Sequence, residues 1–116
     1  MSDSIEGLAR ALQHFATERD WGRFHSPKNL ASALVVEAGE LLEHFQWLTE
    51  EQSRELPEST RSAVADETAD VLLYLVQLCM ALDIDPIAAA QDKLRINAEK
   101  YPVERSTGTS RKYDQL

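Results

Sequence analysis

The sequence predicts an all-α protein, and two observations support that prediction. Apolar residues recur at helical spacing along almost the whole chain, and no stretch of four to eight residues alternates strictly as a half-buried strand would. The 116 residues include only 4 Gly and 4 Pro, too few for a loop-rich or collagenous protein. We therefore expect four helices joined by polar connections.

The first helix is expected from Ser4 to Glu18. Its apolar positions follow the spacing i, i+3, i+7 and i+10, namely Ile5, Leu8, Leu12 and Phe15. Ser4 or Asp3 is a suitable N-cap because its side-chain oxygen can accept a hydrogen bond from a free backbone N–H. Gly22 and Pro27 then interrupt the pattern.

The remaining three helices are expected from Asn29 to Leu48, from Ser59 to Leu82 and from Pro86 to Tyr101. Asn29 is a good N-cap for the second helix. Asp85 before Pro86 combines an N-cap with a proline at the first helical position. We expect residues 1–102 to form one helical domain and residues 103–116 to form a polar, mobile tail.

The third expected helix is unusual because its second half is apolar nearly all the way round. Residues 71–82 read VLLYLVQLCMAL, and a helix of this kind is normally covered on every side. Three short companions from a chain of this size would leave part of it uncovered. The sequence therefore predicts a homodimer, or a dimer of dimers, with this helix at its centre.

Charge and composition exclude several classes of protein. The chain has 20 Asp and Glu against 12 Lys and Arg, a net charge of −8, which opposes nonspecific binding to nucleic-acid polymers or anionic membranes. The longest apolar run is too short to span a membrane, and the N-terminus shows no signal peptide. Cys79 is the only cysteine and is expected to be a small core residue in a reducing compartment. A cytoplasmic location is expected.

Four acidic residues stand out on the second and third expected helices. On a helical wheel, Glu37 falls within the core stripe of the second helix, and Glu40 lies one turn further at its edge. Glu67 and Asp70 form a second acidic pair with i, i+3 spacing beside the packing face of the third helix. Because a single connection makes these helices antiparallel neighbours, we expect the four carboxylates to converge.

Converging carboxylates in a partly desolvated space need a cation, because like charges raise one another's pKa. Oxygen ligands without cysteine favour Mg²⁺ or Mn²⁺ over Zn²⁺. A di-iron site is disfavoured, since Glu40 and His44 are four residues apart and the third helix has no histidine. Solvated helix faces remain an alternative for Glu40 or Glu67 taken singly.

Aromatic and amide residues could form the second half of a site. Trp21, Phe24 and His25 cluster before the second helix, and Trp47 lies at its end. Lys93, Asn97 and Tyr101 share one face of the fourth helix because of their i, i+4, i+8 spacing. Flat rings with an amide suit a nucleobase, and a lysine suits a phosphate. Core aromatics, a capping histidine and a solvated lysine are the alternative interpretation.

Three segments together resemble a known family. WGRFHSPKNLASALVVEAGELLEHFQW, DETADVLLYLVQL and KLRINAEKYP cover residues 21–102 in order, and their combination resembles the MazG-like nucleotide pyrophosphohydrolases, closest to the dCTP pyrophosphatase branch. The resemblance implies a four-helix bundle that dimerises and often forms tetramers. It also implies Mg²⁺-dependent hydrolysis of a nucleoside triphosphate, dCTP or a modified pyrimidine form among them, to the monophosphate and pyrophosphate for nucleotide-pool sanitation.

The resemblance also implies roles for individual residues. The metal-binding acids would be Glu37, Glu40, Glu67 and Asp70. The residues around the nucleotide would be Trp21, Trp47, Tyr74, Lys93, Asn97 and Tyr101, with His25 nearby. Glu40 is the preferred general base and Glu37 the alternative. Val36 stands where longer relatives carry an additional glutamate, so fewer metal ions or a different base are open alternatives.

A non-catalytic interpretation also remains. An acidic helical dimerisation or regulatory module would explain the apolar third helix, but it leaves Glu37 within the core stripe unexplained. Stabilisation by Mg²⁺ and a nucleotide would separate the two interpretations.

Overall fold

The computed structural model describes residues 4–116, and over this range all regular secondary structure is helical. The α-helices are α1 (Ile5–Glu18), α2 (Pro27–Glu43), α3 (Glu50–Arg54), α4 (Glu58–Ala81), α5 (Pro86–Lys100) and α6 (Val103–Ser106), and the 3₁₀ helices are η1 (Gly22–Phe24) and η2 (Tyr113–Gln115). The prediction of an all-α fold is confirmed. The four long helices are those the sequence predicts, while α3 and α6 are short additions in segments expected to be irregular.

Two of the predicted helix caps are present. Ser4 Oγ accepts a hydrogen bond of 3.0 Å from the Gly7 N–H at the start of α1; the alternative cap, Asp3, lies outside the described residues. Asp85 Oδ1 accepts bonds of 3.0 and 3.1 Å from the N–H groups of Ile87 and Ala88. These caps satisfy backbone donors that the first turn of a helix leaves free.

The predicted bounds of α2 are wrong at both ends. The helix begins at Pro27 because Ser26, not Asn29, is the N-cap: its Oγ accepts a 3.2 Å bond from the Asn29 N–H. The helix ends at Glu43 and not at Leu48. Beyond that residue most of the backbone bonds span three residues, with one four-residue bond from the Gln46 N–H to Leu42 O, so the chain tightens into a turn.

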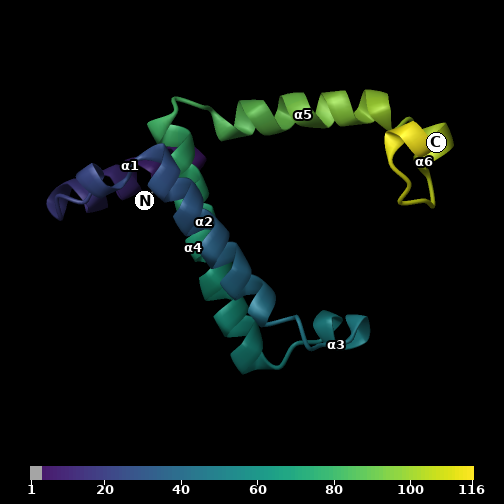
Figure 1. Ribbon diagram of the computed structural model, residues 1–116, viewed down its shortest axis with the longest axis horizontal. Helices are drawn as coiled ribbons and strands as arrows, with labels where there is room; N and C mark the ends of the chain where they lie inside the picture. The colour runs from purple at the N-terminus through teal and green to yellow at the C-terminus, as the bar shows by residue number, and fades with distance from the viewer. Residues whose placement is uncertain (1–3) are drawn as a thin grey trace. The chain divides into compact units, whose positions relative to one another are not determined.

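The chain divides into two compact units, Met1–Ile84 and Asp85–Leu116. In the first unit α2 packs along α4, and α1 packs against α4. Figure 1 shows α2 and α4 side by side and antiparallel, as the single connection between them predicts. The boundary falls inside the single domain expected over residues 1–102, so the structure groups α5 with the C-terminal tail.

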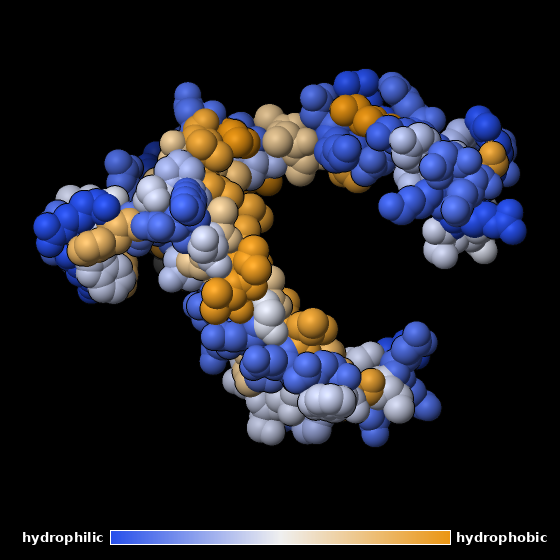
Figure 2. All heavy atoms as spheres, viewed as in Figure 1, coloured by the Kyte–Doolittle hydropathy of each residue, from blue (hydrophilic) through white to orange (hydrophobic). Residues whose placement is uncertain are grey.

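The core of the first unit is small. Among the described residues, only Leu30, Val76 and Cys79 are buried apolar side chains, and the buried Cys79 is the small core residue that the sequence predicts. Large apolar side chains on the same helices are exposed, including Val35 at 70% and Leu42 at 60%. Figure 2 shows such apolar side chains gathered along the α2–α4 pair.

The second unit contains α5 and the residues that follow it. Gly108 has a φ of +79°, a conformation that reverses the chain and favours glycine. After this reversal the Tyr113 ring meets the Tyr101 ring edge-on, with centroids 6.2 Å apart, and Lys100 Nζ lies 4.8 Å from the Tyr113 ring. The expected tail is therefore in contact with the end of α5.

No single helix in the described part of the chain is both long and apolar enough to cross a membrane. The helices α4 and α5 have the length and composition of a membrane span only when they are counted together as one interrupted segment.

Candidate active site

Three carboxylates from two helices converge in the first unit. Glu37 on α2 and Glu67 and Asp70 on α4 each offer one oxygen, and these oxygens lie within 4.8 Å of one another. Glu37 and Glu67 are half-buried, whereas Asp70 is exposed. The convergence follows from the antiparallel packing of α2 on α4, which brings the middle of one helix against the middle of the other.

The buried oxygens of this carboxylate cluster, defined as Glu37, Glu67 and Asp70, have no protein partner. Glu37 Oε2 and Glu67 Oε2 are both shielded from solvent and accept no hydrogen bond in the described structure. A buried carboxylate oxygen without a partner is costly. An all-oxygen donor set of this kind fits a hard divalent cation such as Mg²⁺ or Mn²⁺, which would satisfy both oxygens at once.

Glu40 lies beside the cluster. Its carboxyl group is the largest influence on the pKa of Glu37 and lowers it. Desolvation and the carboxyl groups of Glu67 and Asp70 nevertheless leave the pKa of Glu37 above its ordinary value.

The pKa of Glu40 is also raised, chiefly by the adjacent carboxyl group of Glu37 and by the charge of that residue. Desolvation and the charge of Glu43 raise it further, while the carboxyl group of Glu67 opposes the change. The carboxyl groups of Glu37 and Glu40 thus retain protons more readily than isolated glutamates.

A cavity of about 190 Å³ adjoins the cluster through Asp70. Its walls combine aromatic, apolar and amide side chains, namely Leu12, Phe15, Ala16, Trp21, His25, Asp70, Leu73, Tyr74 and Gln77. Three of the sequence-predicted substrate residues, Trp21, His25 and Tyr74, therefore share one cavity with a member of the carboxylate cluster. A flat apolar wall next to carboxylates suits a ligand with a ring at one end and a metal-bound group at the other.

The segment that carries Trp21 and His25 is held by local hydrogen bonds. The Trp21 N–H donates to Ala16 O at 2.9 Å, and the His25 N–H donates to Gly22 O at 3.1 Å. Asn29 Nδ2 reaches back from α2 to Phe24 O at 3.0 Å. These bonds fix η1 between α1 and α2, so the two cavity residues are positioned by backbone geometry.

The other predicted substrate residues lie elsewhere. Trp47 follows α2, is 87% exposed and does not line this cavity. Lys93 and Asn97 lie on α5 in the second unit, and Tyr101 is the residue directly after that helix; Lys93 is exposed and the other two are half-buried. Phe24, which the sequence groups with Trp21 and His25, is 56% exposed and also lies outside the cavity.

Five cavity residues are absent from the sequence-predicted site, namely Leu12, Phe15, Ala16, Leu73 and Gln77. Phe15 occupies the apolar stripe of α1, which made it look like an ordinary core residue. Gln77 interrupts the apolar run of α4, and its Nε2 donates to Leu73 O at 3.1 Å. Gln77 could have been identified because it is a polar residue inside an otherwise apolar helix. The sequence carries no comparable signal for Phe15.

A larger cavity of about 380 Å³ lies on the other side of His25 and Gln77. It shares these two residues, Leu12 and Ala16 with the smaller cavity but includes no member of the carboxylate cluster. The smaller cavity is therefore the better candidate for a ligand that must also reach the carboxylates.

Comparison with known proteins agrees with this architecture. Residues 33–116 match the MazG-like family. The chain is 43% identical to mouse dCTP pyrophosphatase 1 and 42% identical to the human protein of that name, in each case over 97% of this chain and 68% of the relative. The crystal structure of a pyrophosphatase from Archaeoglobus fulgidus superposes with a TM-score of 0.81 at 40% identity, covering 88% of this chain and 95% of that one.

The fold and site thus define an all-α hydrolase with an acidic centre built between two antiparallel helices. The chain belongs to the MazG-like family, and within it resembles the dCTP pyrophosphatases, so it is an enzyme of the pyrophosphohydrolase class.

Proposed function

We propose that this chain is an Mg²⁺-dependent pyrophosphohydrolase that converts dCTP, or a modified pyrimidine deoxynucleoside triphosphate, to the monophosphate and pyrophosphate. The observation that carries the proposal is the carboxylate cluster, with its two buried and unpartnered oxygens, beside an aromatic cavity. The named activity of relatives at 42–43% identity supports the choice of substrate. Such an activity would serve nucleotide-pool sanitation in the cytoplasm.

In this proposal Glu37, Glu67 and Asp70 hold the divalent cation, with Glu40 at the edge of the site. When bound, the cation supplies charge neutralisation for the triphosphate, which an acidic protein otherwise repels. Trp21 and Tyr74 contact the base in the cavity, which His25 also lines. This arrangement directs the triphosphate toward the carboxylates through Asp70.

Glu40 is the proposed general base. A water oxygen forms a bond to the α-phosphorus, the bond from that phosphorus to the α–β bridging oxygen breaks, and pyrophosphate leaves with the electron pair. The carboxylate of Glu40 accepts the proton of the attacking water. A raised pKa makes this carboxylate a stronger base than an isolated glutamate, and Glu37 is the alternative base.

Three further residues, Lys93 and Asn97 on α5 and Tyr101 directly after it, are proposed to contact the nucleotide. Lys93 would pair with phosphate oxygens, and Asn97 and Tyr101 would contact the base or sugar. Trp47 would add a second ring against the base. The support for these four roles is the family resemblance and, for Lys93 and Asn97, their shared helical face.

We also propose that the chain acts as a homodimer or homotetramer. Val35 and Leu42 lie seven residues apart on one face of α2, and both are more than half exposed. Leu72 and Leu75 on α4 are each 40% exposed. A second copy of the chain would cover these side chains. Size-exclusion chromatography with light scattering tests this, and a monomer at all concentrations would contradict it.

The activity is tested by incubating the protein with individual nucleoside triphosphates and Mg²⁺. Glu40→Gln is expected to abolish turnover. Glu43→Gln makes the same change on the exposed face of α2 and removes only one of the smaller influences on the pKa of Glu40, so it is expected to keep most of the turnover. If Glu40→Gln turned over at the natural rate, Glu40 would not be the base. Stabilisation by neither Mg²⁺ nor nucleotide would instead favour the non-catalytic module.

A further inference from the structure

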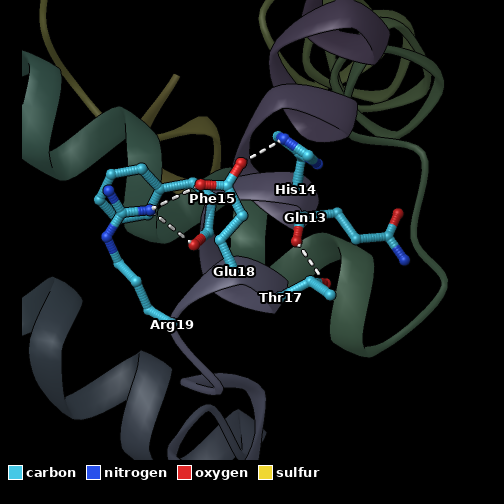
Figure 3. Close-up of polar contacts among 6 residues, drawn as sticks. All are labelled: Gln13, His14, Phe15, Thr17, Glu18 and Arg19. Atoms are coloured by element: carbon cyan, nitrogen blue, oxygen red, sulfur yellow. Dashed lines mark hydrogen bonds and ion pairs between the residues drawn. The ribbon is translucent and has the colours of Figure 1, made fainter.

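A cation and two aromatic rings stack at the C-terminal end of α1. The guanidinium carbon of Arg19 lies 3.7 Å from the centroid of the Phe15 ring. The Phe15 ring in turn meets the Trp21 ring edge-on, with centroids 5.6 Å apart and an interplanar angle of 70°. Figure 3 shows the Arg19 guanidinium lying against the Phe15 ring. We call these three residues the Arg19 stack.

The backbone at the end of α1 makes this stack possible. Asp20 has a φ of +53°, a left-handed conformation that ends the helix and reverses the chain. After the reversal, the Trp21 N–H donates to Ala16 O at 2.9 Å, which returns the indole to the side of Phe15. Sequence spacing alone would not place residues 15 and 21 together on a helix, because six residues is not a helical repeat.

Arg19 is held in place by more than its ring contact. Its Nη1 donates a 3.0 Å hydrogen bond to Phe15 O, so the guanidinium is tied to the same residue whose ring it covers. Glu18 Oε2 lies 3.8 Å from Arg19 Nη1, and Glu18 Oε1 is in contact with His14 Nε2. Figure 3 shows these partners grouped on the last turns of α1.

Only two members of the Arg19 stack reach the cavity. Phe15 and Trp21 line the 190 Å³ cavity with Tyr74 and Asp70, whereas Arg19 does not. Phe15 is 46% and Trp21 44% exposed, so the packing of the chain leaves both rings room to turn toward solvent. A cation over one ring, and edge-on contact between the rings, restrict that freedom.

We propose that Arg19 is a positioning residue of the base pocket: its guanidinium fixes the Phe15 ring, and Phe15 holds Trp21 as the flat wall that a pyrimidine base contacts. Phe15 is thereby a binding residue in its own right. This inference rests on the proposed function in one respect, namely that the base of the substrate occupies the 190 Å³ cavity.

The chain contains a matched control for Arg19. Arg23 lies over the Phe24 ring at 5.0 Å, so it makes the same kind of cation–ring contact four residues further along. Neither Arg23 nor Phe24 lines the cavity. Arg23 also pairs with Asp20 at 3.5 Å, but both side chains are well exposed and such pairs contribute little. Replacing either arginine by methionine keeps an unbranched, flexible side chain and removes the charged guanidinium.

The first experiment measures ring positioning without any need for activity. In a Trp47→Phe background Trp21 is the only tryptophan, and acrylamide quenching of its fluorescence reports its mobility and exposure. Arg19→Met is expected to raise the quenching constant about twofold, Arg19→Lys by less, and Arg23→Met not at all. Equal quenching in the Arg19→Met and Arg23→Met chains would overturn the proposal.

The second experiment measures dCTP hydrolysis in the chain with both tryptophans. Arg19→Met is expected to raise KM about two- to fivefold, the range of an exposed cation–ring contact, with kcat nearly unchanged. Arg19→Lys should recover part of this loss, and Arg23→Met should match the natural chain. A KM unchanged in Arg19→Met would overturn the inference, even with altered quenching. Absence of hydrolysis by the natural chain would instead refute the proposed function, while quenching would still decide whether Arg19 positions Trp21.

Discussion

The substitution Glu37→Gln in the carboxylate cluster is expected to change the melting temperature of the protein, and the sign of that change depends on the presence of Mg²⁺. Glu37→Gln removes one charge from three oxygens that lie within 4.8 Å of one another, and it provides an amide donor beside Glu40 and Glu67. In EDTA the variant is therefore expected to melt at a higher temperature than the natural chain. In excess Mg²⁺ the order is expected to reverse, because the variant has lost one of three ligands.

The size of the reversal follows from binding linkage. At a free Mg²⁺ concentration about 100-fold above the dissociation constant, the natural chain gains ~2.7 kcal/mol of folding free energy. For a domain of this size that corresponds to a rise in Tm of about 11 °C, at ~4 °C per kcal/mol. If losing one ligand weakens binding about 100-fold, the variant gains only ~0.4 kcal/mol, or about 2 °C.

The assay is differential scanning fluorimetry at one protein concentration, with Mg²⁺ titrated against EDTA. Glu43→Gln is the matched control, since it makes the same change on the same helix outside the cluster and should keep the full rise in Tm. The reasoning would be refuted if Glu37→Gln and Glu43→Gln both kept the Mg²⁺-dependent rise of the natural chain. It would also be refuted if Glu37→Gln lowered Tm in EDTA.

Three further predictions concern pH, the core and the tail. Because the folded pKa values of Glu37 and Glu40 lie above the ordinary value of 4.5, their contribution to stability is present below about pH 4.5 and is lost as pH rises through the raised values. In EDTA, the Tm of the natural chain relative to that of a Glu37→Gln, Glu40→Gln variant should therefore fall as the pH rises above about 4.5. A rise in this Tm difference would contradict the raised pKa values. Leu30→Ala, at a side chain only 2% exposed, should cost about 2–5 kcal/mol in urea unfolding, whereas Leu94→Ala, at 68% exposure, should stay within ~0.5 kcal/mol. Gly108→Ala should strain the reversal at φ +79° by about 1–2 kcal/mol, seen as faster hydrogen exchange in the tail; unchanged exchange would show that the reversal does not depend on glycine.

Local signals in the sequence predicted much of the fold. The caps at Ser4 and Asp85 are present because a cap depends on residues within one turn. Glu37 was recognisable because helical periodicity places it in the core stripe, and in the structure it is half-buried. The N-terminus of α2 was misplaced because Ser26 and Asn29 are both good caps. The proline after Ser26 is the same signal that identified Asp85, and it could have ranked Ser26 above Asn29.

The features of the fold and the site that were not predicted from the sequence depend on contacts across a turn or between helices. Phe15 joins the cavity only because the chain reverses at Asp20 and brings Trp21 back beside it. The meeting of Tyr113 with Tyr101 likewise requires the reversal at Gly108. Neither reversal follows from helical periodicity, which describes one element at a time.

The central claim is that the site cleaves a nucleoside triphosphate between its α and β phosphates, and product analysis tests it most directly. The natural chain would be incubated with dCTP and Mg²⁺, and the products resolved by anion-exchange chromatography and ³¹P NMR. We expect dCMP and pyrophosphate in equal amounts, with no turnover in EDTA. Formation of dCDP and orthophosphate would contradict it, as would equal turnover with and without the divalent cation.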